Sequence, residues 1–216
     1  AKIYHNKIIA YGNNFISNYL DHFNPDFLFI NGDLLQRNKT PGMGQLYIFE
    51  IVTILIGLYF AIKGKFQDVK VIFIWLLIAP LAAALTYQTP HALRAQNMVM
   101  PLTLISGLGL GIIVEKILIL KIVFRFALLS VLGLIIISST SFFFHQYFIH
   151  LPKEYGLEWQ YGFDQMISYV LENQDKYQKI VITDRYDQPY VLQLFYSKYD
   201  PAKYQQIPKT EGDNKF

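Results

Sequence analysis

The sequence predicts a mainly helical, multi-pass membrane protein with four transmembrane helices. The chain of 216 residues is 53% hydrophobic. Only 16% of its residues are charged, against roughly 25% in an average soluble domain. The apolar residues are concentrated between Leu46 and Phe144, whereas both flanks have the composition of ordinary globular sequence. We therefore expect a membrane region between two folded flanking segments.

Four apolar segments in this region are assigned as membrane crossings, each of which takes about 20 mostly apolar residues. They are residues 46–62, 71–86, 98–114 and 122–144. Pro80 lies inside the second segment and Pro101 inside the third. Proline is tolerated in such helices because neighbouring helices can satisfy the backbone groups that it frees.

The third segment carries a run of small residues, which are Ser106, Gly107, Gly109 and Gly111. Small residues let the backbones of two membrane helices approach closely. This run therefore predicts a tight contact with another helix.

Positive charges in the short connections predict the orientation, since cytoplasmic loops are enriched in lysine and arginine. The connections after the first and third segments carry Lys63, Lys65, Lys70, Lys116, Lys121 and Arg125. Loop 87–97, between the second and third segments, has Arg94 as its only lysine or arginine. We expect this loop to face outward, and residues 1–45 and 145–216 with it.

The first outer segment, residues 1–45, is expected to hold an amphipathic helix and a structured loop. Apolar residues between Asn6 and Phe23 recur at helical spacing, and such a helix could lie in the membrane interface. Turns are predicted at Asn24-Pro25, Asn31-Gly32-Asp33 and Pro41-Gly42.

The second outer segment, residues 145–216, is expected to be a small and incomplete α/β segment. Residues 163–177 and 190–199 predict helices, and residues 179–184 (KIVITD) predict a buried strand between them. One strand cannot form a sheet, so we expect further strands outside this sequence. A first residue other than methionine also suggests a fragment of a longer protein.

Several classes of function are disfavoured by composition. The chain has no cysteine, and hence no disulfide, thiolate nucleophile or cysteine metal site. The net charge of +3 comes from scattered residues and not from a basic stripe with interleaved aromatic residues. We therefore expect no nucleic-acid partner.

Loop 87–97 (YQTPHALRAQN) holds the most informative pair of polar residues. His91 and Arg94 are three residues apart, so one helical turn would point both side chains in the same direction. The planar guanidinium group of arginine suits a phosphate, and a histidine can add a hydrogen bond or a proton. Alternatively, Arg94 lies among lipid headgroups and His91 caps the loop; the spacing leaves both interpretations open.

Glu50 lies one turn inside the first apolar segment. An ionisable group within a membrane span suggests a function by default, although a position near the outer end also lets it reach water. The outer loop adds a polar group consisting of His22, Asp26, Asp33 and Arg37. Asp33 follows Gly32, and aspartate at such a position is often only a turn former.

Residues 19–58 (YLDHFNPDFLFINGDLLQRNKTPGMGQLYIFEIVTILIGL) and 89–110 (TPHALRAQNMVMPLTLISGLGL) together resemble a known family. They are similar to the later part of bacterial membrane glycosyltransferases of the protein O-mannosyltransferase type, family 39 within the GT-C superfamily. This group includes enzymes that transfer mannose or aminoarabinose from polyprenyl phosphate. The order of parts carries the likeness, which extends over most of residues 7–216: an outer loop with a Gly-Asp turn, PGMGQLY entering a helix, and H-x-x-R heading another.

The resemblance implies a transferase in the bacterial cell membrane that moves a sugar from a polyprenyl-phosphate carrier to an acceptor outside the cytoplasm. Its partners would be that lipid-linked sugar, the bilayer and an acceptor of unknown class. Donor binding is assigned to His91, Arg94, Arg37 and Glu50. No catalytic residue is assigned, because the family's base is an aspartate in an earlier outer loop that this sequence does not contain.

No cofactor is expected; some family members use a divalent metal, but the sequence offers no ligand set for one. The rival interpretation is a non-catalytic multi-pass membrane protein, such as a transporter or a cell-envelope assembly subunit. A transporter is expected to show broken helices and polar residues near the midplane of the membrane.

Overall fold

A computed structural model describes residues 6–65, 69–183, 185 and 188–206. The described part is 70% helical and contains no strand. The mainly helical class predicted from the sequence is therefore confirmed. The chain divides into two compact units, Ala1–Pro152 and Lys153–Phe216. The predicted division into three segments stays a prediction.

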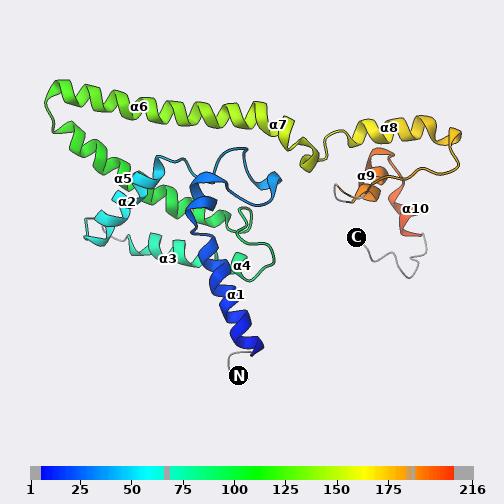
Figure 1. The fold of residues 1–216 in the computed structure, drawn as a ribbon, viewed down its shortest axis with the longest axis horizontal. Coiled ribbons are helices and arrows are strands. Elements are labelled where there is room, and N and C mark those ends of the chain that lie inside the picture. Colours follow the sequence, from blue (N-terminus) through cyan, green and yellow to red (C-terminus); the bar gives the residue numbers. More distant parts are fainter. Residues whose placement is uncertain (1–5, 66–68, 184, 186–187, 207–216) are drawn as a thin grey trace. The chain divides into compact units, whose positions relative to one another are not determined.

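Six α-helices lie wholly within the described part of the first unit. They are α1 (Lys7–Asp21), α2 (Glu50–Ile62), α3 (Lys70–Ile78), α4 (Leu81–Ala84), α5 (Val99–Leu118) and α6 (Ile122–His145). A π-helical turn, η1 (Asp26–Ile30), follows α1, and the 3-10 turn η2 (Gln36–Asn38) lies further along the same loop. Figure 1 shows α2 beside α5, and the N-terminal half of α1 extending away from the other helices.

Two helical stretches within the described residues are long and apolar enough to cross a membrane. They are Gln96–Leu118, of 23 residues, and Ile122–Glu154, of 33 residues. The second is α6 continued through η4 (Gln146–His150) and α7 (Leu151–Glu154). These stretches contain the third and fourth predicted crossings.

The first two predicted crossings form shorter helices, and local contacts explain why. The first begins only at Glu50 and has 13 residues, because the preceding backbone is bonded elsewhere: the Leu46 N–H donates to the Leu28 carbonyl at 2.7 Å. The second is interrupted at Pro80, which separates α3 from α4 and has no N–H for a helical hydrogen bond. A four-span architecture is therefore not established by helix length.

Helices α2 and α5 pack closely and run in the same direction. Thr53 and Ser106 share a hydrogen bond of 2.7 Å between their hydroxyl groups. Beyond the end of α2, Lys65 Nζ donates to Glu115 Oε2 at 2.6 Å. From the first of these contacts to the second, residue numbers rise on both helices, so α2 and α5 run in the same direction. The intervening sequence, which contains α3 and α4, therefore returns the chain to the end at which α2 begins.

Glycines make this close packing feasible, as the small-residue run predicted. A Cβ atom added to Gly57 would collide with the Ile105 carbonyl oxygen, and one added to Gly109 would collide with the Thr53 carbonyl oxygen. Gly107 and Gly111 have no neighbouring atom within 4 Å of such a Cβ. The contact face is therefore formed by Ser106 and Gly109, with Gly107 and Gly111 pointing elsewhere.

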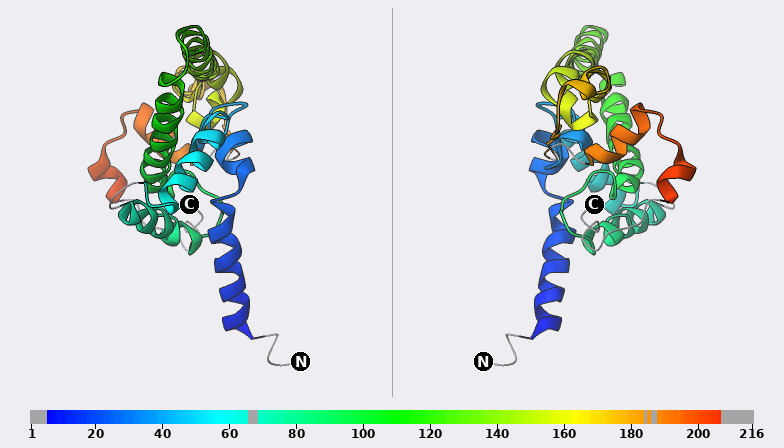
Figure 2. Two further views of the ribbon diagram at one scale, coloured as in Figure 1. Left: turned by 90° about the vertical axis from the view of Figure 1, so that its left-hand side faces the viewer. Right: turned by 90° about the vertical axis from the view of Figure 1, so that its right-hand side faces the viewer.

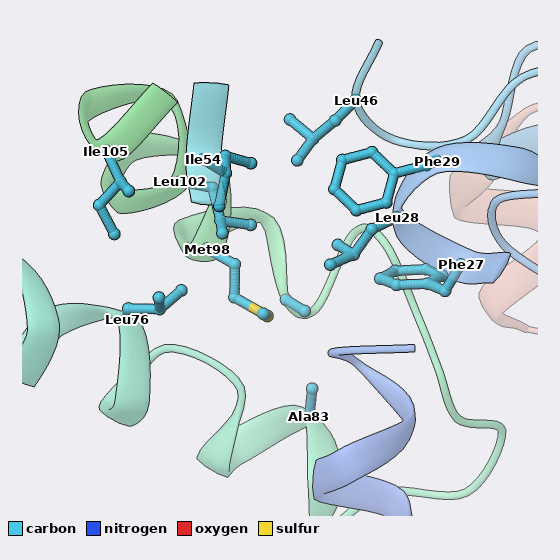
Figure 3. Packing of buried hydrophobic residues seen from close by; sticks show 11 residues of the cluster. Phe27, Leu28, Phe29, Leu46, Ile54, Leu76, Ala83, Met98, Leu102 and Ile105 are labelled. Atoms are coloured by element: carbon cyan, nitrogen blue, oxygen red, sulfur yellow. The ribbon is translucent and has the colours of Figure 1, made fainter. Parts of the chain in front are cut away.

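The hydrophobic core of the first unit lies where η1, α2, α5 and the α3–α4 region meet. Figure 3 shows side chains from these elements converging on one cluster. Its members are Phe27, Leu28, Phe29, Leu46, Ile54, Leu76, Ala83, Ala95, Met98, Leu102 and Ile105. This core connects the loop after α1 with the beginning of α5.

Helix α1 is joined to the broken α3–α4 region by two long-range hydrogen bonds. Asn18 Nδ2 donates to the Ala84 carbonyl at 3.1 Å, and the Tyr19 hydroxyl donates to the Leu77 carbonyl at 2.9 Å. Carbonyl groups at helix ends have no partner within the helix, so these bonds satisfy them. Both views of Figure 2 show α1 projecting beyond these contacts.

The second unit contains α8 (Phe163–Asn173), α9 (Pro189–Tyr196) and α10 (Pro201–Gln205). The two helices predicted here are confirmed, with Tyr177 and Tyr199 lying beyond their observed ends. The predicted buried strand is wrong for residues 179–183, which have no regular structure; residue 184 lies outside the described residues. Val181 is 78% exposed, and no neighbouring strand in the described part offers the hydrogen bonds that a strand requires.

Candidate functional site

Three polar side chains that are far apart in the sequence are buried together at one end of α1. His22 is 0% exposed, Asp33 1% and His91 8%. They come from the C-terminal cap of α1, the turn after η1 and loop 87–97. Buried polar groups are costly unless they are hydrogen-bonded, so the partners of each group determine what the cluster does.

Asp33 cross-links the loop between α1 and α2 to loop 87–97. Its Oδ1 accepts a hydrogen bond from the Leu35 N–H at 2.8 Å. Its Oδ2 accepts one from Asn38 Nδ2 at 3.0 Å and one from the Ala92 N–H at 2.7 Å. The local bond to Leu35 is the turn-forming interaction typical of aspartate. The bond to Ala92 is tertiary and holds loop 87–97 in place.

The hydrogen bonds of His22 define its tautomer. Nδ1 lies 2.7 Å from the Asn18 carbonyl oxygen, which can only accept, so Nδ1 carries the proton. Nε2 accepts a hydrogen bond from the His91 backbone N–H at 3.3 Å, which requires a lone pair. His22 is therefore neutral in this arrangement. Burial lowers its pKa, an effect that outweighs the Asn18 hydrogen bond and the nearby Asp21 and Asp33 carboxylates, which raise it.

His91 has two competing partners at one ring nitrogen. Its Nδ1 lies 3.4 Å from the Arg94 backbone nitrogen and 3.9 Å from Asp33 Oδ2. The first contact needs an unprotonated Nδ1 and is long for a hydrogen bond. The second becomes an ion pair only when the ring is protonated. In either state the side chain of His91 faces the inside of the protein.

Arg94 is exposed, and its own loop holds one edge of its guanidinium group. Nη1 donates to Thr86 Oγ1 at 2.9 Å and to the Tyr87 carbonyl at 2.7 Å. Within the described part of the chain, Nε and Nη2 have no hydrogen-bond partner. The guanidinium group is thus oriented, with its remaining donors open to solvent.

Helical spacing predicted that His91 and Arg94 point in the same direction. In the structure they point in different directions. His91 is buried against Asp33, whereas Arg94 bonds back to Thr86 and Tyr87. The physical reason is that residues 92–95 form a turn and helical structure begins only at Gln96, so the rule for residues three apart in a helix does not apply.

Glu50 is the first residue of α2. It is 9% exposed, and its Oε2 accepts a hydrogen bond from the Tyr47 N–H at 2.9 Å. This N–H belongs to the turn before the helix, and a carboxylate in the first turn of a helix also interacts favourably with the helix dipole. Arg37 lies on the surface in η2, next to Asn38. The donor-binding roles assigned to Glu50 and Arg37 stay predictions.

Sequence reasoning named His22 and Asp33 but did not connect them with loop 87–97. A separation of 59 residues between Asp33 and Ala92 leaves no periodic signal. In the part of the chain that the structure describes, no group of three or more His, Asp or Glu residues is arranged to hold a metal ion. No family model, curated protein or solved structure matches the chain.

Replacing Asp33 with alanine is expected to lower the free energy of unfolding by about 1–3 kcal/mol, because buried donors lose their acceptor. Thermal unfolding in detergent measures the effect. Asp26→Ala is the matched control, since Asp26 is an exposed aspartate of the same loop whose side chain bonds only Asn31. If both variants melt together with the wild-type protein, Asp33 is not a structural cross-link.

Proposed function

We propose that this chain is part of a membrane glycosyltransferase that moves a sugar from a polyprenyl-phosphate carrier to an acceptor on the extracytoplasmic side. The observation that carries the proposal is the oriented, exposed guanidinium group of Arg94, in a loop that buried hydrogen bonds tie to the outer loop. These two loops belong to the two stretches, residues 19–58 and 89–110, that resemble family 39 glycosyltransferases of the GT-C superfamily.

Exposure of α6 supports a membrane location. All residues of α6 are described, none is buried, and the stretch Ile122–Glu154 passes the test for a membrane-spanning helix. A helix that is hydrophobic all round is normally covered, either by protein or by lipid. Since no α6 residue is buried by this unit, lipid is the natural environment for the exposed surface of α6.

The parallel arrangement of α2 and α5 supports four crossings with loop 87–97 outside. The Asp33–Ala92 bond lies at the end where α2 and α5 begin, and the Lys65–Glu115 pair lies at the other end. The basic connections after α2 and α5 would then both be cytoplasmic, as the positive-inside rule requires. Helix α2 spans only about 20 Å at roughly 1.5 Å per residue, so residues 46–49 would lie in the outer interface.

Arg94 is suited to the phosphate of a lipid-linked sugar. When the glycosidic bond breaks, negative charge grows on the leaving phosphate, and a cation already held in place stabilises the transition state more than the ground state. Bonds to Thr86 and Tyr87 provide that orientation, while Nε and Nη2 point free donors outward. In this scheme His91 positions the loop through its buried contacts, and the acceptor's base comes from upstream sequence.

A transporter is less well supported, although α3 and α4 form a broken helix. Transporters use the freed carbonyl groups of such helices to coordinate substrates and ions. Here the Leu77 and Ala84 carbonyls accept hydrogen bonds from Tyr19 and Asn18 of α1. The carbonyl next to the break, Leu77, is therefore already bonded by the Tyr19 hydroxyl, and the one at the far end of α4, Ala84, by Asn18.

Transfer activity of the complete protein tests the proposal. Reconstituted protein would be given polyprenyl phosphates carrying hexose or aminopentose, and release of the free carrier phosphate would be followed. We expect turnover with at least one donor, dependent on Arg94. Absence of turnover with every donor, together with an upstream outer loop that has no acidic residue, would contradict it.

A further inference from the structure

The geometry around His22 requires one protonation state, and this has a consequence for loop 87–97. Nδ1 donates to the Asn18 carbonyl of α1, and Nε2 accepts the His91 N–H from the loop. The imidazole ring therefore bridges the end of α1 and loop 87–97 only while Nε2 has a lone pair. A proton on Nε2 would face the N–H of His91, donor against donor.

We propose that His22 is a pH-sensitive latch: its neutral imidazole holds loop 87–97 against the end of α1, and protonation of Nε2 releases the loop. The proposal goes beyond the proposed function and does not depend on it, because it concerns the structure of the loop and not the chemistry. If loop 87–97 also binds a lipid phosphate, the latch would make that binding weaken in acid.

The charged and titratable groups around His22 determine the direction of the effect. Asp21 on its own helix and Asp33 from the outer loop favour a proton on the ring, whereas His91 from loop 87–97 opposes it. Burial is the largest influence and lowers the pKa. His22 is fully buried, and Phe27 presents an edge-to-face contact at 5.9 Å between ring centroids, which offers no solvation for a cation.

The sign of the pH dependence follows from proton binding. In a released loop, His22 would titrate near the usual pKa of about 6.5. In the latched state its pKa is lower, so the latched state binds fewer protons at any pH between the two values. Acid therefore favours release of the loop. As the pH falls from the unperturbed pKa toward the lower pKa of the latched state, the equilibrium constant for release rises by up to about tenfold per pH unit.

The side chain of His91 also lies near this cluster, with Nδ1 3.9 Å from Asp33 Oδ2. The backbone N–H of His91, and not its side chain, makes the bond to His22. The two histidines can therefore be separated by substitution.

Cysteine labelling measures release of the loop, since the chain has no cysteine of its own. Ala95→Cys places a thiol at a loop position that is 4% exposed, and Tyr87→Cys places one at a position of the same loop that is 88% exposed. The ratio of their maleimide labelling rates cancels the pH dependence of thiol reactivity. We expect this ratio to rise as the pH falls from about 7.5 to about 5, the range in which histidine changes charge.

His22→Gln is the decisive variant, because a glutamine amide can both donate to Asn18 and accept from His91 but cannot titrate. We expect it to keep Ala95→Cys protected at both pH values. His91→Gln should retain the acid-induced rise. A rise that persists in His22→Gln, a ratio that is flat in the wild-type background, or a rise lost only in His91→Gln would each overturn the latch.

Discussion

Replacing Gly109 with alanine is expected to force α2 and α5 apart. The new methyl group would occupy the position where the Thr53 carbonyl oxygen now lies, and a backbone carbonyl cannot rotate away as a side chain can. Overpacking of this kind costs about 1–3 kcal/mol. The Thr53–Ser106 hydrogen bond, one helical turn from Gly109, would be strained by the same displacement.

Gly107→Ala is the matched control. It adds the same methyl group to the same helix, with the same gain in helix propensity, but no atom lies within 4 Å of the new Cβ. We expect Gly107→Ala to melt at or above the wild-type temperature in detergent and Gly109→Ala to melt clearly below it. Equal melting temperatures for the two variants would show that α2 and α5 do not meet at Gly109.

Replacing Arg94 with alanine is expected to reduce turnover by about 100- to 1000-fold, the usual effect of removing one group that stabilises developing charge. The complete protein should still fold, because Arg94 is exposed and, among the described residues, its side chain hydrogen-bonds only the neighbouring Thr86 and Tyr87. Arg94→Lys should recover part of the rate, since it keeps the charge but loses the planar donor pair. Steady-state turnover with the lipid-linked donor is the measurement.

Thr86→Val separates phosphate binding from loop structure. This variant removes one acceptor of the Arg94 guanidinium group and leaves the charge in place. If Arg94 acts on the donor phosphate, Thr86→Val should lose far less activity than Arg94→Ala. Equal losses would mean that Arg94 only holds its loop, and an unchanged rate in Arg94→Ala would remove it from the mechanism.

The helices were predictable from sequence because periodicity and apolar length are local signals. Asn6–Phe23 and the segment beginning at Ile122 became α1 and α6, and the small-residue run identified the face of α5 that contains Gly109. The start of α2 could not be located this way. The Glu50 carboxylate bonds the Tyr47 N–H, and the Leu46 N–H bonds the Leu28 carbonyl. The helix start is therefore fixed by hydrogen bonds of the preceding backbone rather than by hydrophobicity.

The failed strand has a related explanation. The stretch KIVITD has strong β propensity, but propensity in strands mostly reflects packing against neighbouring strands. Residues 179–183 have no neighbouring strand in the described part and remain without regular structure. Their apolar pattern therefore indicated a segment able to pair as a strand, but the described part of the chain provides no partner strand.

The candidate site was predictable in composition but not in geometry. The sequence identified loop 87–97 and its two polar residues from their position between apolar segments. It could not show that His91 turns inward to Asp33 while Arg94 turns outward, because those directions depend on the Asp33–Ala92 and His22–His91 hydrogen bonds. Such bonds join residues 59 and 69 positions apart.

The location of loop 87–97 relative to the membrane is the measurement on which the account depends most. Leu93, which is 67% exposed, would be replaced by cysteine and treated with a membrane-impermeant maleimide in intact cells, with Lys63→Cys beyond α2 as the counterpart. We expect Leu93→Cys to react in intact cells and Lys63→Cys to react only after permeabilisation. The reverse pattern would place the loop in the cytoplasm and contradict both the four-crossing topology and the role proposed for Arg94.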